Sequence, residues 1–335
     1  MMPHDFERVA EWPSDDIVFC LAGSDDGRRL WLGSSDAGVY ELDVSPEKPE
    51  RVKLTGEGHS SYVTGMARCG NGLVTGGYDR RLIWWDLDSG QQRFAVAAHD
   101  KWIRAVAATP DGRRVISVAD DMRCRVWDAE TGERIADVSD HAEKTPHHYP
   151  SMLYAVAVAA DGSRIATGDR TGHVAIWDAE RWEKIGELAA PVMYTWDPRQ
   201  RRHSIGGIRS LAFSPDGGKL AVGGMGKVGN IDHLQGPSRL EIFDLESAKR
   251  LHEIEDEKHK GLIEQIAWAP GGGWILAAGG DHNGFLSTYD TTTGESLQTA
   301  SQNGHIHAVW HDVAFETLYV AGHRRLSRWG RSQPA

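Results

Sequence analysis

Apolar and polar residues alternate along short runs throughout the chain, and tight polar stretches separate these runs. In a representative unit, a first run leads through TPDGRR to a second run, RVISVA, and a third run ends in RVWD. A turn such as ETGE then leads to a fourth, weaker run. Alternation with a period of two, bounded by Asp, Gly and Pro, predicts β-strands joined by turns. Each unit therefore predicts four short strands, and no stretch sustains the period of a helix.

The third run of each unit ends in an aromatic residue and aspartate, or in a variant of that pair. The spacing of about forty residues indicates an internal repeat. Seven units can be counted, and their third runs end at Leu42, Trp85, Trp127, Trp177, Phe243, Tyr289 and Trp329. A four-stranded sheet cannot bury both of its faces by itself, but sheets stacked around an axis bury one another. The pattern predicts an all-β, seven-bladed β-propeller of four-stranded antiparallel blades.

The repeat covers nearly the whole chain, so we expect a single propeller domain over residues 1–335. Only GRSQPA follows Trp329, which is too short for a convincing fourth strand. We therefore expect residues near Phe6 to Ala10 to supply the outer strand of the last blade, which removes an open edge. The approximate blades are residues 15–54, 58–97, 99–138, 151–188, 207–254, 261–300, and 305–330 together with 5–10.

These units resemble the WD-repeat family, in which Gly-His precedes the first strand, Asp lies in the second turn and Trp-Asp ends the third strand. The resemblance implies a hydrogen-bonded network of four side chains within each complete blade. Such a network is physically reasonable, because a buried indole N–H, imidazole and carboxylate must all find partners. The residues of the two most complete networks are His59, Thr75, Asp79 and Trp85 in the second unit, and His99, Ser117, Asp121 and Trp127 in the third.

Other units depart from the family pattern. The fourth unit has Thr171 at the aspartate position, and the seventh has His323 there. The first and fifth units lack the full set of four side chains. We expect the blades of these two units to be held mainly by packing.

Three long segments interrupt the otherwise tight turns: residues 140–151, 189–207 and 225–238. The first two link successive blades, and the third joins the second and third strands of the fifth blade. Links and second turns lie on the same face of a propeller, so we expect all three segments on one face. Long loops in compact domains are usually functional or disordered. The segments either form a wall beside the central opening, over blades three to five, or are independent surface insertions.

Side chains next to the start of each first strand, and in some second turns, are expected on the same face. Tyr, Trp and Arg are the residue types enriched at the energetic centres of interfaces. The candidate partner-binding residues are Tyr62, Tyr78, Trp102, Arg104, Tyr154, Arg170, Arg209, Glu264, Trp310 and His311. Some of these aromatic side chains could instead plug the central channel or pack beneath loops.

The net charge of −11 disfavours a general surface for nucleic acid or for an anionic membrane, since both need clustered Lys and Arg. Arg199, Arg201 and Arg202 form one local cluster, which could bind an acidic or phosphorylated segment or simply be solvated. None of the three cysteines has metal-ligand spacing, and the N-terminal stretch lacks the apolar core of a signal peptide. Because no apolar run is long enough to span a membrane, we expect a cytoplasmic protein with reduced thiols.

No nucleophile, base and orienting group can be justified as a catalytic set from the sequence, and no motif predicts a cofactor or a metal. The sequence therefore predicts a non-catalytic scaffold, a monomer or a subunit of a complex. It would bind a protein or peptide on the insertion-bearing face over blades three to five. The alternative is a propeller enzyme or metal-dependent hydrolase with a ligand in the central opening near His311 and Asp312.

Overall fold

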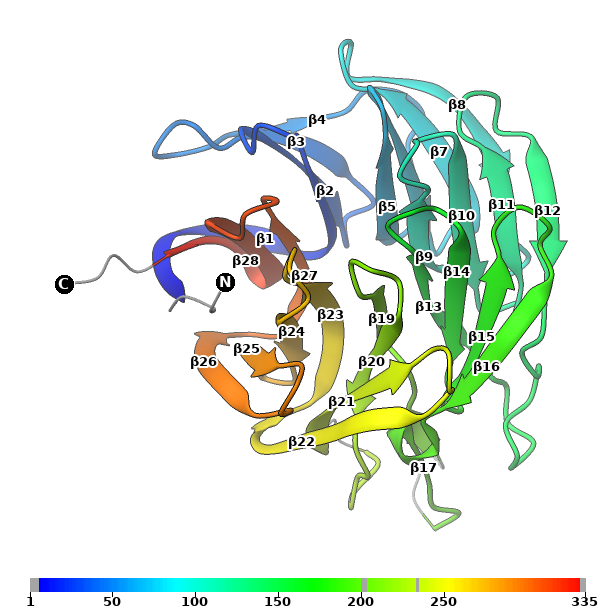
Figure 1. Cartoon of the computed structure of the whole chain (residues 1–335). Coiled ribbons are helices and arrows are strands. Elements are labelled where there is room, and N and C mark those ends of the chain that lie inside the picture. The colour runs from blue at the N-terminus through cyan, green and yellow to red at the C-terminus, as the bar shows by residue number, and fades with distance from the viewer. Residues whose placement is uncertain (1–5, 200–203, 233–234, 332–335) are drawn as a thin grey trace. The chain divides into compact units, whose positions relative to one another are not determined.

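The structure is a computed structural model that describes residues 6–199, 204–232 and 235–331. The described residues form strands β1 to β28 and one short 3₁₀ helix, η1 (Pro191–Met193). None of them forms a helix that is long and apolar enough to cross a membrane. The strands assemble into antiparallel sheets of four or more strands and one small hairpin, which gives the all-β propeller architecture expected from the sequence (Figure 1).

Contacts between residues divide the chain into two compact units. The middle unit contains residues 138–306, and the N–C unit combines the described residues before 138 with those after 306. Each unit contains complete four-stranded sheets of its own. The assignment of residues 1–335 to a single domain stays a prediction.

The N–C unit contains two four-stranded sheets and one six-stranded sheet. The four-stranded sheets consist of β5 (Val63–Cys69), β6 (Gly72–Gly77), β7 (Arg81–Asp86) and β8 (Gln91–Ala97), and of β9 (Ile103–Ala108), β10 (Arg114–Ala119), β11 (Cys124–Asp128) and β12 (Arg134–Val138). The six-stranded sheet has the order β27 (Ile306–His311), β28 (Thr317–Arg331), β1 (Phe6–Gly23), β2 (Arg29–Ser34), β3 (Val39–Asp43) and β4 (Arg51–Lys53).

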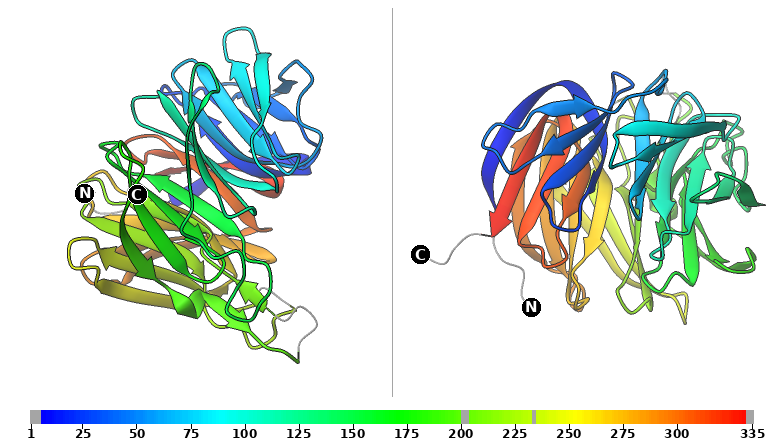
Figure 2. Two further views of the ribbon diagram at one scale, coloured as in Figure 1. Left: turned by 90° about the vertical axis from the view of Figure 1, so that its right-hand side faces the viewer. Right: turned by 90° about the horizontal axis from the view of Figure 1, so that it is seen from above.

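Strand β1 is long enough to serve two repeat units. Its first part pairs with the second half of β28, starting with Phe6 opposite Arg331, and its last part pairs with β2. Strand β28 turns back on itself near Arg324, which has a positive φ of 58°, and the Ser327 hydroxyl donates to the Val320 carbonyl oxygen across the turn. The N-terminal residues therefore form the outer strand beside the C-terminal strand, as expected, and Figure 2 shows the two side by side.

The expected count of seven separate blades requires a correction. The described residues form six sheets of four or more strands. The first and last repeat units share one of these sheets, because β1 runs without interruption from one unit into the other. Six sheets therefore carry the seven repeat units of the sequence.

The middle unit contains three four-stranded sheets and the hairpin of β17 (Tyr194–Trp196) and β18 (Ser204–Gly206). The four-stranded sheets are β13 (Leu153–Val158), β14 (Arg164–Asp169), β15 (His173–Asp178) and β16 (Lys184–Ala189); β19 (Ser210–Phe213), β20 (Lys219–Met225), β21 (Pro237–Asp244) and β22 (Arg250–Lys260); and β23 (Leu262–Trp268), β24 (Trp274–Gly280), β25 (Asn283–Asp290) and β26 (Ser296–Asn303).

Burial decreases from the second strand of a sheet to the fourth. The second strands β10 and β24 are buried along almost their whole length, whereas the fourth strands β8 and β12 are half-buried or exposed. Side chains of neighbouring sheets form shared cores, such as the cluster that joins Leu82 and Trp84 to Ile103 and Val115. Removal of this apolar surface from water is the main force that holds adjacent sheets together.

Candidate functional site

Four side chains form a hydrogen-bonded network in the sheet β5–β8. The Nδ1 atom of His59 lies 2.9 Å from Oδ2 of Asp79, and its Nε2 atom lies 2.8 Å from the Thr75 hydroxyl oxygen. The Trp85 indole N–H donates to the same Thr75 oxygen at 2.8 Å. The structure thus brings together the four residues selected from the sequence. Their bonds tie the loop before β5 to strands β6 and β7.

The sheet β9–β12 contains an equivalent network. The Nδ1 atom of His99 lies 3.1 Å from Asp121, and its Nε2 atom lies 2.7 Å from the Ser117 hydroxyl oxygen. The Trp127 indole N–H donates to the Ser117 oxygen at 2.9 Å. These four side chains are also the ones selected from the sequence.

A third network, in the sheet β13–β16, differs from the sequence prediction. The Oδ2 atom of Asp169 lies 3.0 Å from Nδ1 of His141, and Nε2 of His141 lies 2.8 Å from the Thr167 hydroxyl oxygen. The Trp177 indole N–H donates to Thr167 at 2.9 Å. Thr171, which occupies the expected aspartate position, instead donates its hydroxyl hydrogen to Asp169. The fourth unit therefore has a complete network with its aspartate at a different position.

The sequence pattern did not predict this network because one of its residues lies at an irregular spacing from the first strand. His59 and His99 each precede their first strand by only a short loop, but His141 lies well before β13, which begins at Leu153. The intervening residues form one of the long segments. The available signal was the pair Asp140-His141 directly after the fourth strand of the preceding sheet, which places a histidine at the same point in the repeat as His99.

Acidification should destabilise the protein through these networks. Burial lowers the pKa of His99 below its ordinary value of 6.5. Burial alone would raise the pKa of Asp121, but hydrogen bonds from His99 and from the backbone outweigh it and lower this pKa below 3.8. A folded state that takes up protons less readily than the unfolded chain loses stability as pH falls. We expect the loss to begin near about pH 6.5 through His99 and to steepen below about pH 4 through Asp121.

Guanidinium chloride unfolding, followed by tryptophan fluorescence at a series of pH values, measures this dependence. The matched control is His99→Gln, which should lose the part of the dependence between about pH 7 and pH 5 and keep the steeper loss at lower pH. A midpoint that stays constant or rises as the pH is lowered would contradict the expectation.

Aromatic side chains line up beside the starts of the first strands in the N–C unit. Tyr62 precedes β5, Trp102 precedes β9, and Tyr78 follows β6. The rings of Tyr78 and Trp102 stack with a centroid distance of 4.4 Å and an interplanar angle of 6°. The Tyr62 ring lies 5.6 Å from that of Tyr78 and 5.5 Å from that of Phe19. We call these four residues the aromatic band; its most exposed members are Tyr62 (45%) and Trp102 (47%).

Arg104, in β9, holds two rings of the aromatic band. Its guanidinium carbon lies 5.0 Å from the ring centroid of Tyr78 and 5.4 Å from that of Trp102. Its Nε and Nη2 atoms each donate to the Asp120 carboxylate at 2.7 Å, and Nη1 donates to the Tyr78 hydroxyl oxygen. Because Asp120 balances its charge, Arg104 acts as a positioning residue for the two rings.

Two of the predicted binding residues lie elsewhere. Trp310 and His311 are the last residues of β27, so they lie at the opposite end from the start of the strand. Trp310 packs over Gly23, where an added Cβ would come within 2.3 Å of the ring. The position beside the band belongs to His307, whose ring centroid is 5.0 Å from that of Phe19. The sequence reading failed here because the strand begins directly after His305, without the short loop found in other units.

The contacts of His311 and Asp312 lie within the turn between β27 and β28. The His311 ring stacks on Phe315 at a centroid distance of 3.8 Å, and its Nδ1 atom lies 2.9 Å from the Asp312 carbonyl oxygen. The Asp312 carboxylate accepts hydrogen bonds from the backbone N–H groups of Glu316 and Thr317. Burial lowers the pKa of His311. These structural contacts do not favour the alternative of a catalytic pair at this position.

The candidate residues of the middle unit have varied surroundings. The guanidinium carbon of Arg209 lies 3.6 Å from the ring centroid of Tyr154, which is buried. Arg170 donates to the carbonyl and hydroxyl oxygens of Ser204, which starts β18. Glu264 pairs with His305 at 3.2 Å. The structure therefore brings Tyr154 and Arg209 together and uses Arg170 to hold the hairpin.

The three long segments of the middle unit pack against one another. The His147 ring stacks on Trp196 with a centroid distance of 3.9 Å, which joins the first segment to the second. The Val228 N–H donates to the Thr195 hydroxyl oxygen, which joins the second segment to the third. A small buried cluster lies beneath them, formed by Ile205, Met225, Val228, Ile231 and Leu262. The segments are therefore one packed assembly and not independent loops.

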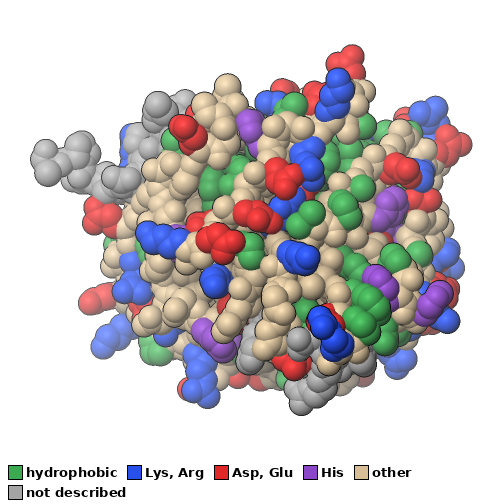
Figure 3. Space-filling view, turned by 90° about the horizontal axis from the view of Figure 1, so that it is seen from below, with side chains coloured by type: hydrophobic (Ala, Val, Ile, Leu, Met, Phe, Trp, Pro, Cys, Tyr) green, Lys and Arg blue, Asp and Glu red, His purple; other side chains and the backbone are tan. Residues whose placement is uncertain are grey.

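The charged groups of these segments do not gather into a described cationic site. Arg199 is exposed and pairs with Asp197 at 3.3 Å, while Arg201 and Arg202 lie outside the described residues. On the face shown in Figure 3, acidic and basic side chains are interspersed. In the middle unit, Asp140, His173 and Glu187 come close enough to share a metal ion, but the Lys184 ammonium group bonds Asp140 and Glu187, each at 2.8 Å. Lysine therefore supplies the cation of that cluster.

Comparison with known proteins identifies the repeats. The WD40 family (WD domain, G-beta repeat) matches residues 50–86, 90–128, 142–178 and 198–228. Nuclear distribution protein PAC1 of Arthroderma benhamiae is 31% identical over 157 residues, which cover 40% of this chain and 32% of that protein. Cilia- and flagella-associated protein 52 of Chlamydomonas reinhardtii is 37% identical over 135 residues, and human Coronin-7 is 30% identical over 123 residues.

The matches cover only part of each relative. The matched regions make up 32% of the PAC1 protein, 22% of the cilia- and flagella-associated protein and 12% of Coronin-7. The first two matched repeats each contain a complete hydrogen-bonded network, and the third contains its network except for His141, which lies just before the matched range. The chain therefore contains WD40 repeats and has a β-propeller fold.

Proposed function

We propose that this protein is a non-catalytic scaffold that binds an extended segment of a partner protein on the aromatic band. The observation that carries the proposal is a row of aromatic rings. Two of its members, Tyr62 and Trp102, are half-exposed, and contacts with the neighbouring ring hold them in position. Rigid aromatic side chains give large contact areas at a low entropy cost, and they dominate the energetic centres of interfaces. WD40 repeats in the same chain support a role in protein interaction.

The spacing of the rings supports an extended ligand. The Tyr62 and Trp102 centroids both lie next to Tyr78, at 5.6 Å and 4.4 Å, so they can be no farther apart than these two distances together. Three residues of an extended polyproline II chain span about 9 Å. This span is within that limit, and we propose that a partner segment places every third side chain on an exposed ring. We also propose that the three long segments of the middle unit, which pack against one another, contribute to partner binding.

The chemistry of the band favours neutral or apolar partner side chains. Arg104 already binds Asp120 and Tyr78, and it faces the rings. Its guanidinium is therefore committed within the protein, and the rings provide the contact surface. An acidic or phosphorylated partner would instead require the ion pair between Arg104 and Asp120 to open. The salt dependence of the affinity for the purified partner would reveal such binding.

The cellular setting belongs to the same proposal. Cys20, Cys69 and Cys124 are all free thiols. Unpaired cysteines are typical of a reducing compartment, which supports action in the cytoplasm.

Truncation of the exposed rings should remove partner binding. We expect Tyr62→Ala/Trp102→Ala to lose at least one partner that the unchanged chain captures from native lysate, with an affinity at least about tenfold weaker for the purified partner. Quantitative mass spectrometry of the captured proteins and titration of the purified partner measure the two effects.

A matched control is Ile185→Ala/Leu297→Ala, which truncates two exposed aliphatic side chains on outer strands. This control should keep every partner, and circular dichroism should show that both variants are folded. If the aromatic variant is folded and retains the same partners at unchanged affinity, the aromatic band is not the binding surface.

A further inference from the structure

Two arginines of the middle unit, Arg170 and Arg209, lie beside the second long segment. Arg209 directly precedes β19, just after that segment ends. Arg170 directly follows β14 and donates to the carbonyl and hydroxyl oxygens of Ser204, within the segment, at 2.9 Å and 2.8 Å. Both arginines are half-buried, so the charge of each is partly removed from water.

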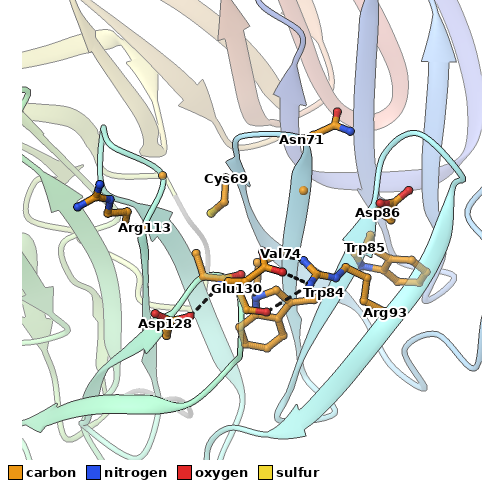
Figure 4. A pocket seen from close by; sticks show the side chains of 13 residues that line it. Cys69, Asn71, Val74, Trp84, Trp85, Asp86, Arg93, Arg113, Asp128 and Glu130 are labelled. Carbon is orange, nitrogen blue, oxygen red and sulfur yellow. Dashed lines mark hydrogen bonds and ion pairs between the residues drawn. The ribbon is translucent and has the colours of Figure 1, made fainter.

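Neither of these arginines has a counter-charge. In the hollow between the sheets β5–β8 and β9–β12, by comparison, Arg93 pairs with Glu130 at 3.2 Å (Figure 4). Among the described residues, no carboxylate forms a hydrogen bond or an ion pair with Arg170 or Arg209, and the Nε atom of each is buried without an acceptor. A buried donor without a partner is unfavourable, and such a group in a native protein calls for an explanation.

Strand register explains why Arg209 lacks the counter-charge that Arg104 has. Each arginine immediately precedes a first-strand residue that pairs with the second strand, so the two positions are equivalent. Beyond that pairing partner, the second strand leads to Asp120 in the sheet of Arg104 and to Met225 in the sheet of Arg209. Asp120 supplies a carboxylate at 2.7 Å, whereas Met225 is apolar and completely buried. The position that neutralises Arg104 therefore offers no charge to Arg209.

The preceding sheet shows the same difference. In the N–C unit, the Tyr78 hydroxyl oxygen accepts a hydrogen bond from Arg104. Arg170 has the position of Tyr78 in the sheet that precedes Arg209, because the backbone N–H of each donates to the residue directly before the first strand of its sheet. An apolar side chain and a second cation thus replace the two acceptors that Arg104 has.

The following sheet does not supply the missing charge. Glu264 has the position in β23 that is equivalent to that of Arg209. Its carboxylate pairs with His305 at 3.2 Å, and over the described residues no ion pair joins it to Arg209. The positive charge of Arg170 and Arg209 therefore remains without a bonded carboxylate.

The guanidinium of Arg209 is held in one orientation. Its central carbon lies 3.6 Å from the Tyr154 ring centroid, so the group lies against the face of the ring. The Tyr154 hydroxyl donates to the Met152 Sδ atom at 2.8 Å, and Nη1 of Arg170 lies 3.9 Å from the same sulfur, which links the two arginines. Stacking leaves the in-plane N–H groups of a guanidinium available, and the Nη atoms of Arg209, unlike its Nε atom, are not buried.

We propose that Arg209 binds the oxyanion of a partner side chain, a phosphate monoester in preference to a carboxylate, and that the charge of Arg170 strengthens this binding. The guanidinium fork donates two parallel hydrogen bonds to a phosphate or a carboxylate. A phosphate monoester carries nearly two negative charges at neutral pH, which matches two arginines better than the single charge of a carboxylate. The site extends the proposed scaffold function and rests on it, but it needs neither Tyr62 nor Trp102.

Three short peptides that differ in one side chain test the site. They are acetylated, amidated hexapeptides of sequence Gly-Ala-X-Leu-Ala-Gly, in which X is phosphoserine, glutamate or serine. Isothermal titration with the full chain should show that the phosphoserine peptide binds at least about tenfold more tightly than the serine peptide, with the glutamate peptide between them. Equal affinity of the phosphoserine and serine peptides, or no binding of either, would overturn the proposal. A glutamate peptide that binds as tightly as the phosphoserine peptide would overturn the preference for phosphate.

Variants of single arginines locate the binding. Arg209→Gln should abolish the preference for phosphoserine, and Arg209→Lys should keep part of it, because lysine retains the charge without the fork. Arg170→Gln should reduce the preference without abolishing it. The matched control is Arg181→Gln, which removes an exposed arginine of the same unit and should preserve the preference. Circular dichroism checks that each variant is folded, and full preference in a folded Arg209→Gln protein would overturn the proposal.

The variant of the aromatic band separates this site from the proposed function. Tyr62→Ala/Trp102→Ala should keep the full preference for phosphoserine, even though we expect it to lose a partner protein. Loss of the preference in that variant would assign the peptide to the aromatic band and overturn a separate site at Arg209.

Discussion

Replacement of Asp169 by alanine should lower the free energy of unfolding by about 3 kcal/mol. Asp169 is 1% exposed, and its carboxylate accepts hydrogen bonds from the His141 ring, the Thr171 hydroxyl and the backbone N–H groups of Thr171 and His173. Alanine would leave a buried imidazole and two partly buried N–H groups without their acceptor. The cost of such unsatisfied groups exceeds the value of the bonds themselves. Denaturant unfolding of the purified variant measures the change.

The matched control is Thr171→Val, because the family pattern places Thr171 at the aspartate position. Valine removes one hydrogen bond to Asp169 and keeps the shape of the side chain, so we expect a loss of only about 1 kcal/mol. Equal losses for the two variants, or a larger loss at Thr171, would show that Asp169 is not the centre of the network.

Replacement of Arg239 by methionine should destabilise the middle unit by about 3–5 kcal/mol. Arg239 is 1% exposed and its partner Glu241 is 0% exposed. Their atoms Nε and Oε1 lie 2.6 Å apart, and the same guanidinium lies 2.6 Å from Glu253 and 2.5 Å from Glu255. Methionine fills the volume but leaves the buried Glu241 carboxylate with only Arg250, which is partly exposed. An ionised group buried without a full counter-charge is strongly unfavourable.

A double-mutant cycle separates the ion pair from simple packing. In Arg239→Met/Glu241→Leu neither buried charge remains, so the double variant should recover most of the stability lost in Arg239→Met. Arg250→Met, at the exposed side of the same network, should cost at most about 1 kcal/mol. Additive losses in the double variant would show that the destabilisation arises from packing and not from the uncompensated carboxylate. Denaturant midpoints of the unchanged chain, Arg239→Met, Glu241→Leu, the double variant and Arg250→Met provide the measurement.

Local sequence pattern predicted the strands and the networks wherever the spacing was regular. The turns recur at fixed offsets, and the histidine, hydroxyl, aspartate and tryptophan of the second and third units are each a short step from a strand end. In those units the hydrogen bonds form as the pattern implies. The pattern failed where an insertion altered the spacing, as between His141 and β13. It also failed where a strand begins directly after the histidine without an intervening loop, as β27 does after His305.

For the candidate binding residues, residue type suggested which side chains to consider, and the structure shows what these side chains contact. Residue type directed attention to Tyr62, Tyr78 and Trp102, whose role in binding stays a prediction, and only the structure shows that these rings form one row with Phe19. Composition also suggested Arg104 as a contact for a partner. The structure assigns its guanidinium to Asp120 and Tyr78 instead, because the partner of a charged group depends on which strands become neighbours.

The sequence by itself determined the class of fold, the four-strand repeat and the pairing of the N-terminal residues with the last strand. These properties follow from period-two alternation and from turn residues, which act over a few neighbouring positions. Only the tertiary structure decided that β1 joins two repeat units in one sheet and that the three long segments pack against one another. Such features depend on contacts between residues far apart in the chain, where burial and charge pairing, and not local preference, determine which side chains meet.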